Sequence, residues 1–420
     1  MSAFMPDVKP SISSKDRNIL RDLAKKQMEY ARSEANKKTI ELWYQHNACQ
    51  GVRPPIHLEL WTFQEEVIPK RLRTESEDAR NIETALYMNF LNHELFGDDF
   101  PVPDYFPLSK NVHMIPFGLP VKRNHAGDSL GHQFEHHILD LEEDYHKLAE
   151  SKITNNQAET NEKKLLLQDI FGGILPVKEV MNALYSVPTQ DIVHIMSMET
   201  MYIAMMDYPG LFHEMMRRYT ADTMRYFRYL ESGRILETTT HLEPLGQGSW
   251  CFNNELPVKD SPELKTTELW GFMDSQETAA ISPAMFEEFI FPYYKEISNN
   301  FGLLSYGCCE PVHPIWDNCI SKMNNLRKVS ISPWCDLDMM AKRLRGKKII
   351  FHRKPSPNYL GVDKHLDEEA FRKHIRQTLC SAKGCSLEIT QRDVYSINHD
   401  EGKARRYVEI IREEIVNHWH

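Results

Sequence analysis

Between residues 269 and 357 the chain repeats one pattern four times: a short apolar run ends at polar or thiol side chains, and a helix-like stretch follows. The four runs lie at residues 269–277, 303–311, 328–336 and 348–355. This alternation of strand and helix signals predicts a parallel α/β fold. In parallel α/β barrels the active sites gather at the carboxyl ends of the strands. We therefore expect the reactive residues of the four runs to lie along one edge of the sheet.

The rest of the chain follows the same alternation from about residue 55 to its end. It predicts an α/β protein with a (β/α)8 TIM-type barrel over residues 51–420. Residues 1–50 are predicted to form an N-terminal helical extension, because apolar residues recur at near-helical spacing between residues 14 and 48. Further strands are predicted at residues 56–61, 112–118, 191–196, 236–245 and 386–389.

Composition and charge exclude several classes of function. Hydrophobic residues make up 41% and charged residues 26% of the chain, as in ordinary globular proteins. The formal net charge of -10 argues against a nucleic-acid partner, because phosphate binding needs a basic face. No apolar run approaches the roughly 20 residues of a membrane-spanning helix, and residues 1–10 lack the apolar region of a signal peptide. The eight cysteines are scattered in a long chain, so we expect reduced thiols and a cytoplasmic protein without a membrane partner.

Cys308, Cys309 and Glu310 end the second run and predict a metal site. Thiolates favour zinc, and carboxylates complete many catalytic zinc sites that keep one open position. Alternate side chains of a strand share a face, so Cys308 and Glu310 are placed to act together. Glu388 on the last predicted strand is a candidate remote ligand, because burying a carboxylate without a partner is costly. Two alternatives stay open: the cysteines are small buried core residues, or Glu388 is an edge-strand carboxylate in water.

Three further side chains are candidates for catalysis. His241 and Glu243 lie two residues apart on the predicted strand 236–245 and would share a face, as an acid/base pair requires. A satisfied polar pair in the core is an equal alternative. Glu277 belongs, with Asp274, to the polar end of the first run, which is placed to bind a hydroxyl, amine or carboxylate of a substrate.

Two other segments carry charged or metal-binding residue types. His352, Arg353 and Lys354 end the fourth run as a cationic segment, which suits an anionic group of a substrate or cofactor. Residues 132–136 read His-Gln-Phe-Glu-His and match the H-x-x-E-H motif of a class of zinc peptidases. That motif functions only on a long helix with a further carboxylate ligand, and nothing else in the sequence supports a peptidase.

Part of the sequence resembles a known superfamily. Residues 272–275, a helix that starts at Ser282 and Pro283, and residues 289–293 (Phe-Ile-Phe-Pro-Tyr) resemble the uroporphyrinogen decarboxylase superfamily, which includes the methylcobamide methyltransferases. The resemblance is most specific between residues 268 and 357. It implies a (β/α)8 barrel with its active site at the carboxyl-terminal face of the strands.

Two departures from the superfamily patterns narrow what the resemblance implies. Uroporphyrinogen decarboxylases carry an R-Q-A-G-R motif near the first strand, and residues 56–61 contain none, which argues against porphyrinogen decarboxylation. The methyltransferase branch holds zinc through an H-x-C pair at a strand end and a later cysteine. Here residues 305–310 read Ser-Tyr-Gly-Cys-Cys-Glu, and Glu388 stands near the end of the chain. The resemblance therefore implies zinc ligands drawn from these two cysteines and from carboxylates.

The function implied by the resemblance is a zinc-dependent methyltransferase that moves a methyl group between a small substrate and a corrinoid (cobalamin). Zinc would act as a Lewis acid on the substrate. The sequence has no D-x-H-x-x-G corrinoid-binding motif, so the corrinoid would arrive on a partner protein. The charged N-terminal helix is compatible with a homodimer. Two interpretations compete: a metal-free decarboxylase or lyase in which His241, Arg353 and Lys354 bind the carboxylate of a small acid, and a non-catalytic ligand-binding barrel.

Overall fold

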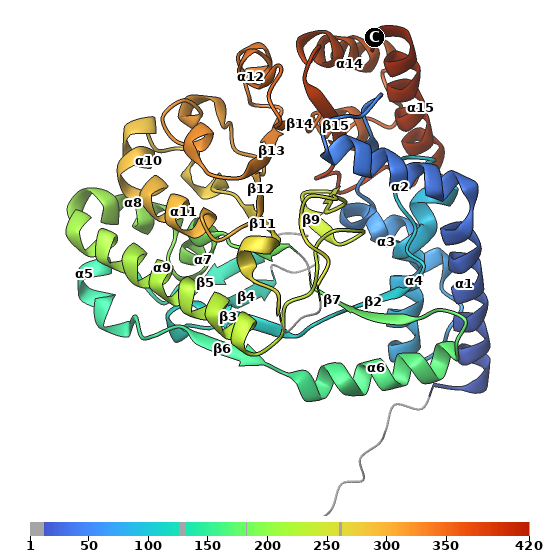
Figure 1. The fold of residues 1–420 in the computed structure, drawn as a ribbon, viewed down its shortest axis with the longest axis horizontal. Coiled ribbons are helices and arrows are strands. Elements are labelled where there is room, and N and C mark those ends of the chain that lie inside the picture. The colour runs from blue at the N-terminus through green and yellow to red at the C-terminus, as the bar shows by residue number, and fades with distance from the viewer. Residues whose placement is uncertain (1–11, 126–131, 182, 260–262, 420) are drawn as a thin grey trace, which may run out of the picture.

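The computed structural model describes residues 12–125, 132–181, 183–259 and 263–419. At its centre is a curled sheet of seven parallel strands in the order β1-β15-β14-β13-β12-β11-β8 (Figure 1). The predicted parallel α/β architecture is confirmed, and the four runs supply the adjacent strands β11 to β14. The strands are β1 (Ile56–Leu58), β8 (Leu184–Tyr185), β11 (Trp270–Met273), β12 (Leu303–Tyr306), β13 (Leu326–Ile331), β14 (Ile350–Arg353) and β15 (Ser386–Gln391).

The sheet is open in the described part of the chain, because no pairing joins its edge strands β1 and β8. These residues therefore form a curled, seven-stranded sheet in place of the predicted closed barrel of eight strands. Residues 191–196 were predicted as a strand and lie mostly in helix α7 (Pro188–Ile195). Proline in the first turn favours helix initiation, and a short apolar run does not by itself distinguish a buried strand from a buried helix. Residues 236–243 are irregular, and only the short antiparallel pair β9 (Pro244–Gly246) and β10 (Ser249–Trp250) follows them.

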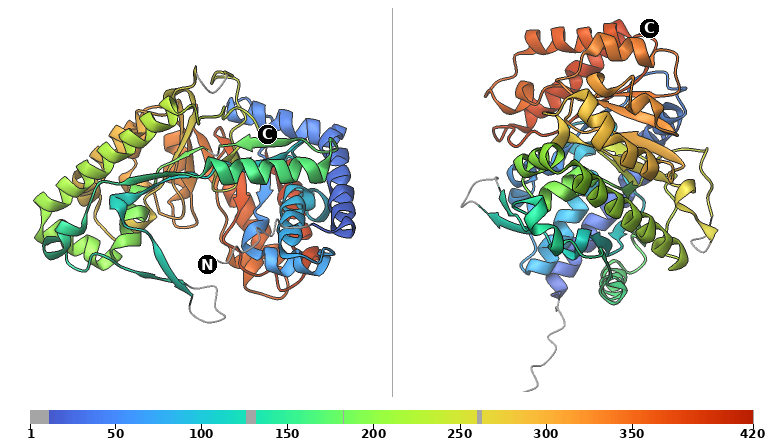
Figure 2. Two further views of the ribbon diagram at one scale, coloured as in Figure 1. Left: turned by 90° about the horizontal axis from the view of Figure 1, so that it is seen from below. Right: turned by 90° about the vertical axis from the view of Figure 1, so that its left-hand side faces the viewer.

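Helices surround the curled sheet (Figures 1 and 2). Leu304, Val329 and Phe351 of the central strands are fully buried and belong to one large apolar core that the helices share. None of the helices in the described ranges is long and apolar enough to cross a membrane. The helices of this layer are α8 (Met198–Asp207), α9 (Pro209–Ser232), α10 (Pro283–Phe289), α11 (Phe291–Ser298), α12 (Leu337–Leu344), α13 (Asn358–Gly361), α14 (Glu368–Ser381) and α15 (Glu401–His418).

The N-terminal extension consists of two helices, α1 (Ser14–Arg32) and α2 (Glu34–Asn47), where the sequence predicted one. Ser33 separates them, because its hydroxyl accepts a hydrogen bond from the N–H of Asn36 and caps α2. The apolar face of α1 packs on α4 (Glu77–Leu95), which follows β1 and the short helix α3 (Gln64–Val67).

The described residues between 106 and 180 form a lobe outside the main sheet, along the lower edge of Figure 1. The segment 132–136, which matches the H-x-x-E-H motif, begins with a strand of this lobe, so the helix that this zinc motif needs is not formed there. The lobe contains the strand pairs β2 (Phe106–Ser109) with β7 (Val177–Val180), β3 (Val112–Ile115) with β6 (Lys152–Asn155) and β4 (Lys122–His125) with β5 (His132–Glu135), and the helices α5 (Leu141–Asp144) and α6 (Gln157–Phe171).

Candidate functional site

The side chains of a strand point alternately to the two sides of the sheet. Predicted site residues can therefore meet on the concave side only where their positions in the strands point them there. Lys328 of β13 and Glu388 of β15 contact each other across the intervening strand β14, as only side chains on the concave side can. His352 of β14 lies 3.2 Å from Glu388 and shares that side. Lys354 follows His352 by two residues and faces the same way, whereas Arg353 faces the opposite way.

Glu388 is the centre of a fully buried ion cluster on the concave side. Its Oε2 accepts hydrogen bonds from Lys328 Nζ at 2.9 Å and from His46 Nε2 of α2 at 2.9 Å. Lys328 Nζ also donates to Ser249 Oγ at 2.6 Å. Burial alone would raise the pKa of Glu388, but the charge of Lys328 and the hydrogen bond from His46 hold this pKa well below its ordinary value. Glu388 is therefore the ionised partner of Lys328.

Cys308 and Cys309 follow β12 through a turn at Gly307. Gly307 has a φ of +99°, and a Cβ atom there would lie 3.1 Å from Ser330 Cβ, so this turn requires glycine. The turn brings the Sγ atoms of the two cysteines to 3.5 Å from each other. Cys309 Sγ also donates a hydrogen bond to Asp393 Oδ2 at 3.3 Å. A pair of thiols thus stands at the carboxyl edge of the sheet, where reactive residues were predicted.

Two cationic side chains flank this thiol pair. Lys354 Nζ donates to the carbonyl oxygen of Cys308 at 2.9 Å and to Gln247 Oε1 at 2.6 Å. Arg392 Nη1 lies 3.8 Å from Cys308 Sγ, while its Nε donates to Glu59 Oε2 at 2.8 Å. Positive charge beside a thiol stabilises the thiolate.

The two thiols differ in acidity. The hydrogen bond from the Cys308 thiol lowers the pKa of Cys309, and the charge of Lys354 lowers it further, against the opposing effects of burial and of the Asp393 carboxylate. The same hydrogen bond and burial raise the pKa of Cys308. Cys309 is half-buried, whereas Cys308 is buried. Cys309 is therefore the more accessible and the more readily ionised thiol of the pair.

Two buried carboxyl groups lie next to the thiols. Glu310 accepts hydrogen bonds from the backbone N–H of Ser275 at 3.0 Å and of Cys308 at 2.8 Å, one to each carboxylate oxygen, and so ties the loops after β11 and β12 together. Asp274 is buried, and its Oδ1 has no hydrogen-bond partner among the described residues. Burial and the charge of Glu310 raise the pKa of Asp274 well above its ordinary value, which favours its protonated form.

Cys309 and Glu310 border a cavity of about 800 Å³ at the carboxyl edge. This volume lies within the range of small-molecule sites. Trp334, with 73% of its surface exposed, and residues of α7 form other parts of the wall. Glu277, predicted as catalytic, also lines the cavity; it accepts a hydrogen bond from Thr189 Oγ1 at 2.8 Å, and burial raises its pKa. The structure thus brings Glu277 into the same cavity wall as Cys309.

His241 and Glu243 lie elsewhere, in the irregular stretch before β9. Glu243 Oε2 accepts a hydrogen bond from the backbone N–H of His241 at 2.8 Å, and the imidazole of His241 contacts the hydroxyl of Tyr44 on α2. Lys178 Nζ donates to Glu243 Oε1 at 3.4 Å. The two residues contact each other, but neither lines the cavity beside Cys309.

The cationic run at the end of β14 does not form one patch. His352 lies in the ion cluster, where burial lowers its pKa to about 3, so the imidazole is neutral at pH 7. Arg353 points away from the concave side and donates to the carbonyl oxygens of Ile331 at 3.2 Å and Ser332 at 2.8 Å. Only Lys354 of the three reaches the thiol pair.

Three residues near the thiols were not predicted as part of the site. Arg392 and Asp393 directly follow β15 and contact the thiols. The rule that reactive residues follow strand ends, applied to the last predicted strand, would have identified both. Tyr185 belongs to β8, a strand of two residues that its sequence does not reveal. Its ring stacks on Phe272 with the centroids 4.7 Å apart, and burial raises its pKa.

The four predicted zinc ligands do not converge. Cys308 and Cys309 form the thiol pair. Both carboxylate oxygens of Glu310 accept hydrogen bonds from backbone N–H groups. Glu388 belongs to the ion cluster with Lys328. Within the described ranges no group of three or more His, Cys, Asp or Glu side chains is arranged to hold a metal ion. The residues present therefore do not fit the predicted four-ligand zinc site.

Comparison with solved structures finds a similar fold. A methyltransferase from Methanosarcina mazei superposes with a TM-score of 0.52 at 11% sequence identity, over 91% of this chain and 99% of that chain. At this identity the likeness concerns the fold alone. No protein-family model matches the chain, and no curated protein matches it by sequence.

Proposed function

We propose that this protein is a methyltransferase whose reaction centre is Cys309 and the cavity beside it. The observation that carries the proposal is the thiol pair, with 3.5 Å between its Sγ atoms, flanked by two cations at the carboxyl edge of the sheet. Parallel α/β folds hold their active sites at this edge. The fold shared with the Methanosarcina mazei methyltransferase supports the type of reaction.

In this proposal Cys309 moves a proton during methyl transfer. When the methyl group goes to a small substrate, the Cys309 thiolate takes the proton from the heteroatom of the substrate, and that heteroatom attacks the methyl carbon while the bond from this carbon to the methyl carrier breaks and leaves its electron pair on the carrier. In the reverse direction the carrier supplies the electron pair that attacks the methyl carbon, and the Cys309 thiol returns the proton to the heteroatom as the methyl group leaves it. Lys354 stabilises the Cys309 thiolate between these events, and the protonated Asp274 is proposed as a second proton donor.

The proposed methyl carrier is a corrinoid on a partner protein, as the resemblance of residues 272–293 to the methylcobamide methyltransferases implies. Trp334 lies at the cavity rim, and its exposed side chain is available for contact with such a partner. No step is assigned to zinc, because the residues predicted to hold it do not converge. A cytoplasmic location, which would keep the thiols reduced, is part of the proposal.

The test measures methyl exchange with methylcobalamin as the probe and a panel of small thiols and amines as acceptors, followed by the absorbance change of the cobalamin. We expect wild-type protein to demethylate methylcobalamin with at least one acceptor. Cys309→Ser should slow the reaction by about 100-fold or more, the usual loss on removing a general acid–base group. Cys380→Ser changes an exposed cysteine on α14 and is the matched control, with wild-type rates expected.

Two results would overturn the proposal. One is a Cys309→Ser variant that transfers methyl groups as fast as wild type. The other is wild-type protein that demethylates methylcobalamin with no acceptor of the panel.

A further inference from the structure

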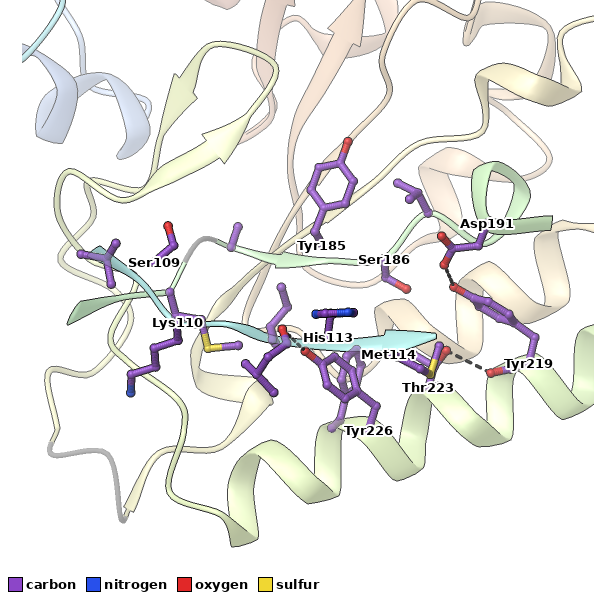
Figure 3. A pocket seen from close by; sticks show the side chains of 17 residues that line it. Ser109, Lys110, His113, Met114, Tyr185, Ser186, Asp191, Tyr219, Thr223 and Tyr226 are labelled. Atoms are coloured by element: carbon purple, nitrogen blue, oxygen red, sulfur yellow. Dashed lines mark hydrogen bonds between the residues drawn. The ribbon is translucent and has the colours of Figure 1, made fainter. Parts of the chain in front are cut away.

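A second cavity lies between β3, residues 183–187 and α9 (Figure 3). Its volume is about 310 Å³, at the lower end of the range for small-molecule sites. Neither Cys309 nor Glu277 is among the residues that line it, so this cavity is distinct from the cavity beside Cys309, although Tyr185, which lies near the thiols, forms part of its wall.

One wall of the second cavity carries a carboxylate without a cationic partner. Asp191 lies in the first turn of α7, and its Oδ2 accepts a hydrogen bond from the Tyr219 hydroxyl at 2.5 Å (Figure 3). Burial raises the pKa of Asp191 to about 6, so the group is mostly ionised at pH 7. The charged neighbour that acts on it is Glu277, which is itself acidic, and no Lys, Arg or His among the described residues forms an ion pair with Asp191. A partly buried negative charge is therefore left uncompensated.

A buried hydroxyl adds a second unsatisfied group to the same cavity. Ser186 directly follows β8 and is 4% exposed, and its Oγ has no hydrogen-bond partner among the described residues. Ser186 and Asp191 both line the cavity, from the end of β8 and the start of α7 (Figure 3). Buried hydroxyl groups are normally paired, so this one points to a ligand that hydrogen-bonds to it.

The cationic side chains near this cavity do not neutralise Asp191. Lys110 Nζ donates to Glu237 Oε1 at 2.5 Å and to the carbonyl oxygen of Ile235 at 2.7 Å, so its charge already has a partner. His113 is exposed on β3. The cavity therefore attracts cations and repels anions.

Aromatic and apolar side chains form another part of the wall, beside polar ones such as Thr223. Tyr219, Tyr226, Phe227 and Met114 line it, and the Tyr226 hydroxyl is satisfied by the carbonyl oxygen of Val112 at 3.2 Å. Aromatic faces attract organic cations, and apolar side chains favour the burial of alkyl groups.

We propose that this second cavity binds a small organic ammonium ion, with the cationic group against the Asp191 carboxylate and the Ser186 hydroxyl and the alkyl part against the aromatic wall. A neutral ligand would leave the charge of Asp191 uncompensated, and a carboxylate ligand would be repelled by it. The inference does not depend on the proposed methyl transfer, because it concerns a different cavity and a binding equilibrium.

The test is isothermal titration of the full-length protein at pH 7.5 with butylammonium, 1-butanol and butyrate, which share an alkyl chain and differ in charge. We expect butylammonium to bind and the other two to bind at least about tenfold more weakly. Asp191→Asn keeps the shape of the side chain and the acceptor for Tyr219, and should weaken butylammonium binding by about tenfold or more. Ser186→Ala should weaken it by a smaller factor. Glu214→Gln, on the exposed face of α9, is the matched control and should bind as wild type does.

Three outcomes would overturn the inference: no binding of butylammonium to wild type, equal affinity for butylammonium and 1-butanol, or unchanged affinity in Asp191→Asn. If circular dichroism shows that Asp191→Asn does not fold, the butylammonium affinity of Ser186→Ala is compared with that of Glu214→Gln, and this comparison decides whether the inference holds. Ser186→Ala is suited to it because the substitution removes only a hydroxyl. Loss of butylammonium binding would leave the Cys309 proposal untouched, since that proposal is tested by methyl exchange.

Discussion

Cys308 and Cys309 are neighbours in the sequence whose surroundings give them opposite acidities. The Cys308 thiol is buried and donates its proton toward Cys309, and Lys354 adds a positive charge near both. The chemistry proposed for the pair therefore belongs to Cys309. A sequence pattern cannot distinguish the two, because the difference comes mainly from the direction of the hydrogen bond between them, which the fold sets.

The first prediction concerns the ionisation of Cys309. Alkylation by iodoacetamide should modify Cys309 before Cys308, and its rate should rise with pH around a midpoint below that of free cysteine, because the thiolate is the reactive form. Lys354→Met removes a nearby positive charge and should move the midpoint to higher pH. Peptide mass spectrometry of samples quenched over a pH series measures both. Faster modification of Cys308, or a midpoint unaffected by Lys354→Met, would contradict the assignment.

The second prediction concerns Glu388, which was expected to bind a metal and instead neutralises Lys328. Removing one member of a buried ion pair costs about 3–5 kcal/mol, so Glu388→Gln should lower the free energy of unfolding at pH 7 by roughly that amount. The folded-state pKa of Glu388 lies below its unfolded value, so its contribution is present above the unfolded value of about 4.3 and is lost as the pH falls through the folded one.

Urea unfolding of wild type and Glu388→Gln at pH 7, and then at decreasing pH below about 4, checks this second prediction. The difference between the two proteins should be largest at pH 7 and should shrink in acid. A variant as stable as wild type at pH 7 would show that Glu388 is not the charge partner of Lys328.

At the scale of elements, the strands were more predictable than the directions of their side chains. The four runs between residues 269 and 357 became four adjacent strands, because their apolar residues are buried on both faces of a parallel sheet. The run His352 to Lys354 was expected to act as one cationic patch, but the strand period of two sends Arg353 to the opposite face. Residues 191–196 were misassigned because the helix signal, Pro188, lies before the apolar run.

The third prediction concerns the turn between β12 and the thiols. Gly307→Ala introduces a Cβ atom at a φ of +99° and 3.1 Å from Ser330 Cβ, so it should destabilise the protein by about 1–3 kcal/mol. The same strain should displace the thiol pair and slow the alkylation of Cys309. Gly210→Ala in α9 is the control, because a Cβ atom there meets no other atom within 4 Å. Equal unfolding free energies for both variants would show that the turn tolerates alanine.

At the scale of the whole molecule, the C-terminal end of α2 reaches the interior of the sheet. His46 of α2 reaches Glu388 in the ion cluster, and the Asn47 side-chain amide donates to the carbonyl oxygens of Trp250 at 2.9 Å and Phe252 at 2.7 Å. The sequence predicted an amphipathic extension over residues 1–50, but contacts of more than 200 residues' separation leave no local pattern from which these hydrogen bonds could be predicted. The second cavity could not be predicted from the sequence for the same reason, because β3, α7 and α9 come together only in the folded chain.

The central claim, that Cys309 is the reacting group of a methyltransferase, is tested most directly by one titration. The protein is treated with iodoacetamide in increasing amounts until Cys309 is fully alkylated, and each sample is analysed for the alkylated fraction of every cysteine and for methyl exchange with methylcobalamin. Activity should fall in direct proportion to the alkylated fraction of Cys309 and should not follow that of Cys380. Protein that keeps its activity with Cys309 fully alkylated would contradict the claim.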